Sequence, residues 1–177
     1  IAILMTFCLS IMTYAQTPRD RATELKEQAQ SSLNQKDYIK ARYLFKKAYE
    51  AFATRENYPQ AIESGVQANA LYVRENFYKE GFELCRDMDQ LIWAGEQNQK
   101  KVFYDLRFLV NKERLQMYTA LKNPAQAKTQ LNKLEETANL AKNDSLTEVL
   151  LYTKANYYYT FNQNTQGDAC FRKLINQ

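Results

Sequence analysis

The side chains that most often carry out catalysis are scarce in this sequence. There is no histidine among its 177 residues, so neither a Ser-His-Asp triad nor an HExxH zinc site can be assembled. The four glycines stand at positions 65, 81, 95 and 167, and this spacing allows neither a Walker loop nor a GxGxxG phosphate turn. The sequence therefore lacks the residues of the commonest hydrolase, metalloprotease and nucleotide-binding sites.

Carboxylate pairs and one thiol are the remaining candidates for chemistry. The pairs are Glu135 with Glu136 and Asp87 with Asp89, and helical periodicity puts both on polar faces, where solvated charge is expected. Cys85 falls at a core position and has no identifiable base. Cys85 and Cys170 are 85 positions apart, and two such cysteines do not make a disulfide framework. We therefore expect Cys170, too, to fill a core position of a helix. We predict a protein that is not an enzyme and that uses no cofactor and no metal.

Charge and composition exclude further classes. The net charge of +4 arises from 24 basic and 20 acidic residues that are interspersed along the chain, so no basic stripe for nucleic acid is present. Hydrophobic residues make up 45% and charged residues 25%, a globular balance, and only four Gly and three Pro interrupt the chain. This combination favours helices over a sheet protein.

The first fifteen residues, IAILMTFCLSIMTYA, are uncharged and end at the small residues Thr13 and Ala15. We interpret residues 1–15 as a signal peptide clipped at its N-terminus, followed by a mature domain at 16–177 on the periplasmic or extracytoplasmic side of the membrane. The alternative is a membrane anchor, although about 20 apolar residues are needed to span.

A helical face recurs along the rest of the chain. It begins with Tyr38, Ala41, Phe45, Ala48 and Phe52, spaced i, i+3, i+7, i+10 and i+14. The same pattern returns around Gly81, Ala127 and Gly167, so the small residue recurs at intervals of 40, 46 and 40 residues. A period in this range is typical of stacked helical hairpins.

Partner helices are expected between these repeated faces, at residues 21–34, 58–75, 99–121 and 145–162. Asp144 or Ser145 is a candidate N-cap, with Glu148 at the capping-box distance from Ser145. Pro59 and Pro124 fit the first turn of a helix.

The repeated pattern resembles tetratricopeptide (TPR) repeats, which place small and aromatic residues at fixed positions of a helical hairpin. The first repeat supplies Ala29, Tyr38, Ala41, Phe45 and Ala48, the third Tyr118, Ala127 and Leu131, and the fourth Leu151, Ala155, Tyr158, Gly167 and Phe171. The repeats here run 40 to 46 residues instead of the family's 34, Ser32 replaces an aromatic residue, and Asn69 and Leu115 occupy small positions. The resemblance implies an all-α fold, a right-handed α-solenoid of about four long hairpins over residues 21–177.

The same resemblance indicates a candidate binding surface. TPR proteins present certain positions of the first helix of each hairpin on a concave groove, and here those positions hold Arg74, Lys112, Gln116, Tyr152, Asn156 and Tyr159. Tyrosines, amides and a base suit the binding of a protein or peptide segment. The alternative is that the tyrosines pack between unusually long helices.

The leading functional hypothesis is a non-catalytic protein-binding or peptide-binding module. Its organisation resembles the exported N-terminal TPR region of membrane-anchored bacterial regulators, of the sensor histidine kinase or helix-turn-helix type. The last repeat lacks a polar capping helix, so we expect the chain to continue, and a membrane contact would come only through a downstream anchor. The alternative is an envelope scaffold, and a glycan-binding protein is disfavoured because Trp93 is the sole tryptophan.

Overall fold

The computed structural model describes residues 20–176, and these fold into eight α-helices with no strand within that range. The helices are α1 (Arg21–Asn34), α2 (Tyr38–Ala53), α3 (Tyr58–Arg74), α4 (Tyr78–Gln99), α5 (Tyr104–Ala120), α6 (Pro124–Ala141), α7 (Asp144–Thr160) and α8 (Asn164–Ile175). The prediction of an all-α protein is confirmed. The predicted signal segment, 1–15, lies outside the described residues. Within the described part, no helix is both long and apolar enough to cross a membrane.

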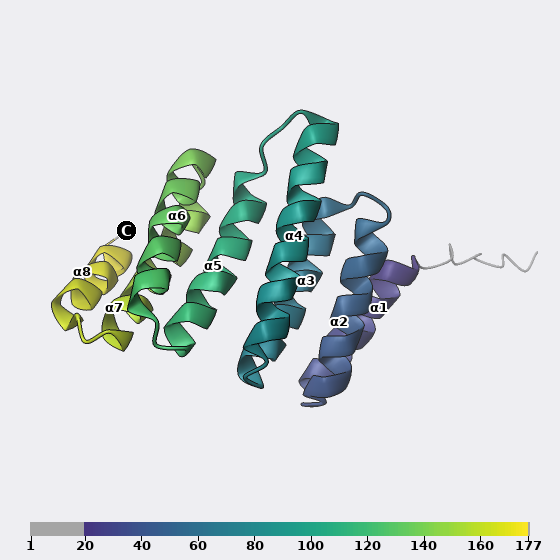
Figure 1. The fold of residues 1–177 in the computed structure, drawn as a ribbon, viewed down its shortest axis with the longest axis horizontal. Helices are drawn as coiled ribbons and strands as arrows, with labels where there is room; N and C mark the ends of the chain where they lie inside the picture. The colour runs from purple at the N-terminus through teal and green to yellow at the C-terminus, as the bar shows by residue number, and fades with distance from the viewer. Residues whose placement is uncertain (1–19, 177) are drawn as a thin grey trace, which may run out of the picture.

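Successive helices pack as hairpins, α1 with α2, α3 with α4, α5 with α6 and α7 with α8. The hairpins follow one another along the long axis of the molecule (Figure 1). Contacts between neighbouring hairpins join α2 to α3, α4 to α5 and α6 to α7, and the first helices also meet, α3 with α5 and α5 with α7. Helix α5 therefore lies at the centre of the packing.

The turn inside each hairpin has the same backbone geometry. One residue takes a left-handed conformation: Lys36 (φ 63°), Asn76 (φ 63°), Lys122 (φ 53°) and Asn162 (φ 59°). The amide of the next residue donates to the carbonyl five residues earlier, as in Asp37 N to Ser32 O and Gln163 N to Tyr158 O. This is the Schellman arrangement that ends a helix and satisfies its last carbonyls.

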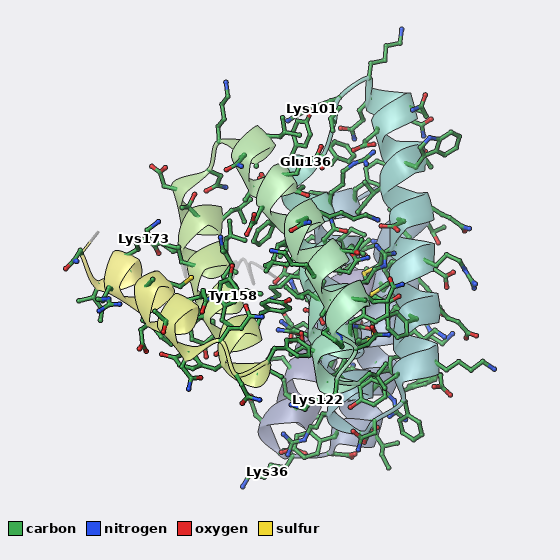
Figure 2. All side chains as sticks on the ribbon, turned by 60° about the vertical axis from the view of Figure 1, so that its left-hand side comes forward. Lys36, Lys101, Lys122, Glu136, Tyr158 and Lys173 are labelled. Atoms are coloured by element: carbon green, nitrogen blue, oxygen red, sulfur yellow. The ribbon has the colours of Figure 1, made fainter. Side chains whose placement is uncertain are left out.

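In each hairpin the small residue of the sequence repeat stands five positions after the left-handed residue of the turn and is buried, at Ala41, Gly81, Ala127 and Gly167. It is the fourth residue of the second helix each time. The intervals of 40, 46 and 40 residues thus mark one structural position. Figure 2 shows Lys36 and Lys122, from two of these turns, at one end of the molecule and Lys101, from the loop between α4 and α5, at the other.

Side-chain caps start many of the helices. Asp37, Asn57, Asn123 and Asn143 accept hydrogen bonds from backbone amides of the first turns of α2, α3, α6 and α7. Pro59 and Pro124 lie in the first turns of α3 and α6, as predicted. The predicted N-cap at Asp144 or Ser145 was wrong, because Asn143 caps α7 by accepting from Ser145 N at 3.1 Å.

The predicted helix at 99–121 was also wrong at its start. Helix α4 runs through Gln99, Lys100 adopts a left-handed conformation (φ 50°), and α5 begins only at Tyr104. The linking residues Lys100 to Phe103 include no Gly, Pro or Asn, so the sequence carries no turn signal there. The loop is held instead by Glu96, whose Oε1 accepts from Phe103 N at 2.9 Å.

Two hydrophobic clusters meet at α5. Leu106, Val110 and Met117 pack with the cluster built from α1 to α4, whereas Phe108 and Leu115 belong to the cluster that α5 shares with α6 and α7. Cys85 and Cys170 are buried free thiols, as the periodicity predicted. Burial raises the pKa of Cys85 to about 12, so this thiol stays protonated at neutral pH.

Candidate functional site

A groove between α5 and α7 brings together four of the six residues selected from the sequence. Lys112 and Gln116 come from α5, and Tyr152 and Asn156 come from α7. The groove has a volume of about 350 Å³. Each pair is separated by four residues, so the two side chains of a pair lie one above the other on one helix face. Because α5 and α7 pack side by side, the two faces form opposite walls.

The walls offer aromatic area and hydrogen-bonding groups. Tyr152 is 54% exposed, and its ring is supported from behind by an edge-on contact with Phe171, with 6.2 Å between the ring centroids. Gln116 and Asn156 are exposed amides, and each has both donor and acceptor capacity. A fixed aromatic ring between amides is suited to holding an extended polypeptide.

The groove is electropositive. Two lysines, Lys112 and Lys122, line it, and no carboxylate does. The ammonium of Lys112 lies 3.6 Å from Oε1 of Glu113, a buried residue of the same helix. Lys122, in the left-handed turn after α5, has no ion pair within residues 20–176. The arrangement favours a neutral or acidic segment over a basic one.

No protein-family model, curated protein or solved structure matches the chain.

Arg74 and Tyr159 are not in this groove. The guanidinium of Arg74, the last residue of α3, lies 4.0 Å from the ring centroid of Tyr38, the first residue of α2. Tyr159 stacks on Phe171 with 5.8 Å between ring centroids, and its hydroxyl donates to Asp168. Both side chains thus bind other parts of the protein, and for Tyr159 this is the packing alternative stated above.

Several lining residues were missed by the sequence argument. They are Leu115, Thr119, Ala120, Lys122, Val149, Thr153, Tyr157 and Thr160. Most lie three or four positions from a selected residue: Val149 precedes Tyr152 by three, and Thr160 follows Asn156 by four. Extending each selected face by one helical turn would have found them. Lys122 gave no such signal, since it lies beyond the end of α5.

The carboxylates considered for catalysis serve as ion-pair partners or are solvated. Asp89 pairs with Arg114, and Glu135 pairs with Lys154 at 2.7 Å. In residues 20–176 no group of three or more His, Cys, Asp and Glu side chains is placed to hold a metal ion.

Proposed function

We propose that this chain is a non-catalytic module that binds a protein or peptide segment in the groove between α5 and α7. The observation that carries the proposal is the convergence of Lys112, Gln116, Tyr152 and Asn156 on one groove.

We also propose that the four hairpins form a right-handed α-solenoid of the TPR type. Support comes from the left-handed turn residue, the hydrogen bond that follows it and the small buried residue, which recur in the four hairpins at intervals of 40, 46 and 40 residues. The turn from α2 to α3 has the same three features, at Glu56, Asn57 and Ala61. The contacts of α5 with α3 and α7 are those expected when the first helices of successive hairpins stack. In such an array, first helices line the inner surface, where the groove lies.

The groove's length sets the size of the segment. Val149 and Thr160, which both line the groove from α7, are eleven residues apart, which corresponds to about 16 Å along the helix axis. An extended peptide advances about 3.3 Å per residue, so about five residues fill the groove. Lys122 favours a segment with an acidic residue, whereas the ammonium of Lys112 already lies 3.6 Å from Oε1 of Glu113.

The test is selection from a phage-displayed library of random peptides about ten residues long, sized to exceed the groove. Selected peptides should bind the wild-type chain and lose about tenfold or more in affinity when Tyr152 or Asn156 is replaced by Ala. The matched control is Tyr43→Ala, since Tyr43 is 61% exposed on α2 and lies outside the groove. Equal binding by Tyr152→Ala and wild type contradicts the proposal.

The wider role we propose is that of an exported input region of a bacterial signalling protein. Fractionation of cells that express the natural gene tests export, with the chain detected by an antibody raised against residues 20–176. Recovery of the chain with cytoplasmic marker proteins argues against an exported role. The signalling step itself is tested by comparing whole-cell transcript profiles of Tyr152→Ala and Tyr43→Ala strains.

An envelope scaffold is the second candidate, and exposed Ile39 favours it. This side chain is 68% exposed on α2 and lies one turn before Tyr43, which is 61% exposed, so the two form an apolar patch that contact with a second copy would bury. Sedimentation of the wild type and of Ile39→Lys decides the matter. A concentration-dependent oligomer that Ile39→Lys disrupts supports the scaffold, and a monomer in both contradicts it.

A further inference from the structure

Helices α3 and α5 occupy matching places in their hairpins but differ on one face. Each has 17 residues, and all their positions correspond at an offset of 46. Along one face α3 carries the small residues Ala61, Gly65 and Ala68, all buried. The same register in α5 holds Arg107, Asn111 and Arg114. Three large polar side chains thus replace three small ones.

The small face of α3 allows close packing. A Cβ at Gly65 would lie 2.6 Å from Met88 Sδ of α4 and 3.2 Å from Tyr49 Cδ2 of α2. Side chains from α2 and α4 therefore close over α3 at this point. No comparable space for a ligand remains there.

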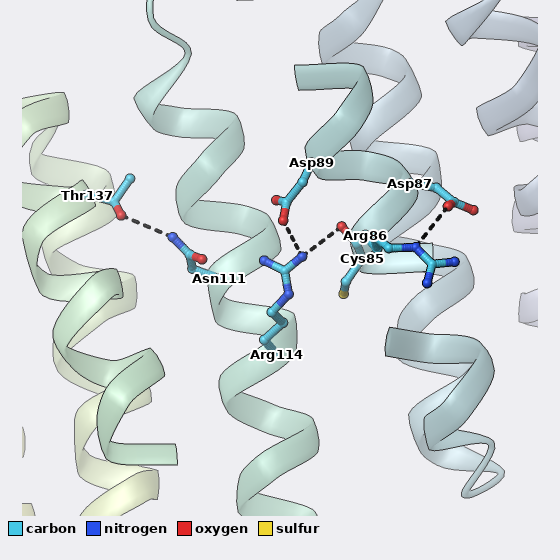
Figure 3. Close-up of polar contacts among 7 residues, drawn as sticks. All are labelled: Cys85, Arg86, Asp87, Asp89, Asn111, Arg114 and Thr137. Carbon is cyan, nitrogen blue, oxygen red and sulfur yellow. Dashed lines mark hydrogen bonds and ion pairs between the residues drawn. The ribbon is translucent and has the colours of Figure 1, made fainter. Parts of the chain in front are cut away.

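The large polar face of α5 is instead left open between α4 and α6. Figure 3 shows Arg114 reaching to Asp89 and to the backbone oxygen of Cys85 on α4, while Asn111 donates to Thr137 on α6. The polar side chains form the floor of a groove of about 470 Å³. This volume lies within the range of small-ligand sites.

An exposed tryptophan stands on the wall of this second groove. Trp93 of α4 is 62% exposed, and Leu140 of α6, also in the lining, is 48% exposed. Tyr104 adds a second aromatic ring at the start of α5. A tryptophan left this accessible beside a polar floor provides a flat apolar surface next to many hydrogen-bonding groups.

The charges of the second groove balance. Its three cations are Arg107, Arg114 and Lys133, and its carboxylates are Asp89 and Glu136, with Glu96 beneath Arg107 as the third. Both guanidinium groups are already paired, with Glu96 and Asp89. A strongly charged ligand therefore gains little here. Free capacity remains as donors and acceptors at Arg107, Asn111 and Glu136.

We propose that this groove binds a neutral oligosaccharide. The single tryptophan argued against glycan binding at the level of sequence, but the structure leaves its ring exposed at the wall of a polar groove. A pyranose ring has an apolar C–H face that can cover the indole of Trp93, and its hydroxyls both donate and accept, which matches the balanced floor of Asn111, Arg107 and Glu136. The site is distinct from the groove between α5 and α7, since the two use different faces of α5. It does not depend on peptide binding.

The test uses Trp93, the sole tryptophan, as its own reporter. The whole chain is titrated with cellotetraose, maltotetraose and chitotetraose while tryptophan emission is recorded. At least one sugar should give a saturable blue shift with a Kd of about 1 mM or tighter. Asn111→Ala should weaken that affinity about tenfold, because one floor hydrogen bond is lost.

Two further variants guard against loss of folding. Glu136 is exposed and has no ion pair within the described residues, so Glu136→Ala should fold normally and still weaken binding severalfold. Asn132→Ala, an exposed position on α6 outside the groove, is the matched control and should bind like wild type. Circular dichroism checks that each variant is folded.

No saturable change with any of the three sugars overturns the proposal, as does a change that Asn111→Ala and Glu136→Ala leave intact. A selected peptide whose binding is lost in Glu136→Ala but kept in Tyr152→Ala also overturns it, in favour of a peptide in this groove. Failure of the α5–α7 groove to bind peptides leaves the saccharide titration unaffected, so the two proposals fail separately.

Discussion

Asn69 on α3 donates a hydrogen bond from Nδ2 to Oε2 of Glu113 on α5 over 3.0 Å, and both side chains are buried, at 0% and 2% exposure. The pair joins the second and third hairpins across 44 residues of sequence. Oδ1 of Asn69 has no hydrogen-bond partner. Burial raises the pKa of Glu113, although Asn69 and Lys112 counteract this in part.

Replacing Glu113 by Gln should stabilise the protein at pH 7. Since the pKa of Glu113 is higher in the folded state than the 4.5 of an unperturbed glutamate, the carboxylate opposes folding once pH rises through that range. The contribution of Glu113 to the free energy of unfolding should therefore become more favourable as pH falls, and Glu113→Gln should lack this change. We expect a gain on the order of 1 kcal/mol at pH 7 that vanishes near pH 4, measured by urea unfolding. The prediction is wrong if Glu113→Gln has a lower free energy of unfolding than the wild type and this difference is larger at pH 7 than at pH 4.

Glu96 should have the opposite pH dependence. Its buried carboxylate accepts two hydrogen bonds from Arg107 and one from Phe103 N, and the bonds from Arg107 are the main reason why its pKa is lowered. A lowered pKa stabilises the fold above the unfolded value of about 4.5, and this stabilisation is lost as pH falls through the folded value. Glu96→Gln should cost about 1 to 3 kcal/mol at pH 7 and less at pH 3. Equal losses in the free energy of unfolding at pH 7 and pH 3 would show that the charge of Glu96 does not stabilise the fold.

The sequence predicted the helical repeat well because its signals are local. The face of Tyr38, Ala41 and Phe45 follows from periodicity alone, and the structure buries Ala41 and Phe45. The loop at Lys100 could not be predicted in this way, because it depends on Glu96 reaching across to Phe103 N. A side-chain hydrogen bond between residues seven positions apart needs no Gly, Pro or Asn, so it cannot be recognised from turn residues in the sequence.

The candidate site was predictable to a similar degree. Lys112 and Gln116 were found because their helix positions decide which face they occupy. Tyr159 could not be placed, since its ring position depends on Phe171 and Gly167 of α8. The second groove was missed altogether. It arises from a difference between two repeats, at Asn111 and Gly65, that becomes meaningful only when the helices are aligned.

Gly95→Ala should destabilise the protein although alanine is the better helix former. A Cβ at position 95 would lie 2.8 Å from Phe103 Cε2 and 2.9 Å from Tyr58 Cε1, and both are atoms of rigid rings. We expect a loss of about 1 to 3 kcal/mol in thermal or urea unfolding. Gly65→Ala is the comparison, because its closest contact is the flexible end of Met88. A loss at Gly65 as large as that at Gly95 contradicts the explanation by ring rigidity.

Lys36→Gly should stabilise the protein. Lys36 ends the turn between α1 and α2 with φ of 63°, a conformation that costs an L-residue about 1 kcal/mol or more and costs glycine almost nothing. Part of the gain is offset by the greater freedom of glycine in the unfolded chain, so the expected net gain is about 0.5 to 1 kcal/mol. The matched control is Lys46→Gly, ten residues on and exposed in the middle of α2, which should lose about 1 kcal/mol. Melting temperatures of the two variants should therefore move in opposite directions, and a decrease for both would show that the left-handed turn is not under strain at Lys36.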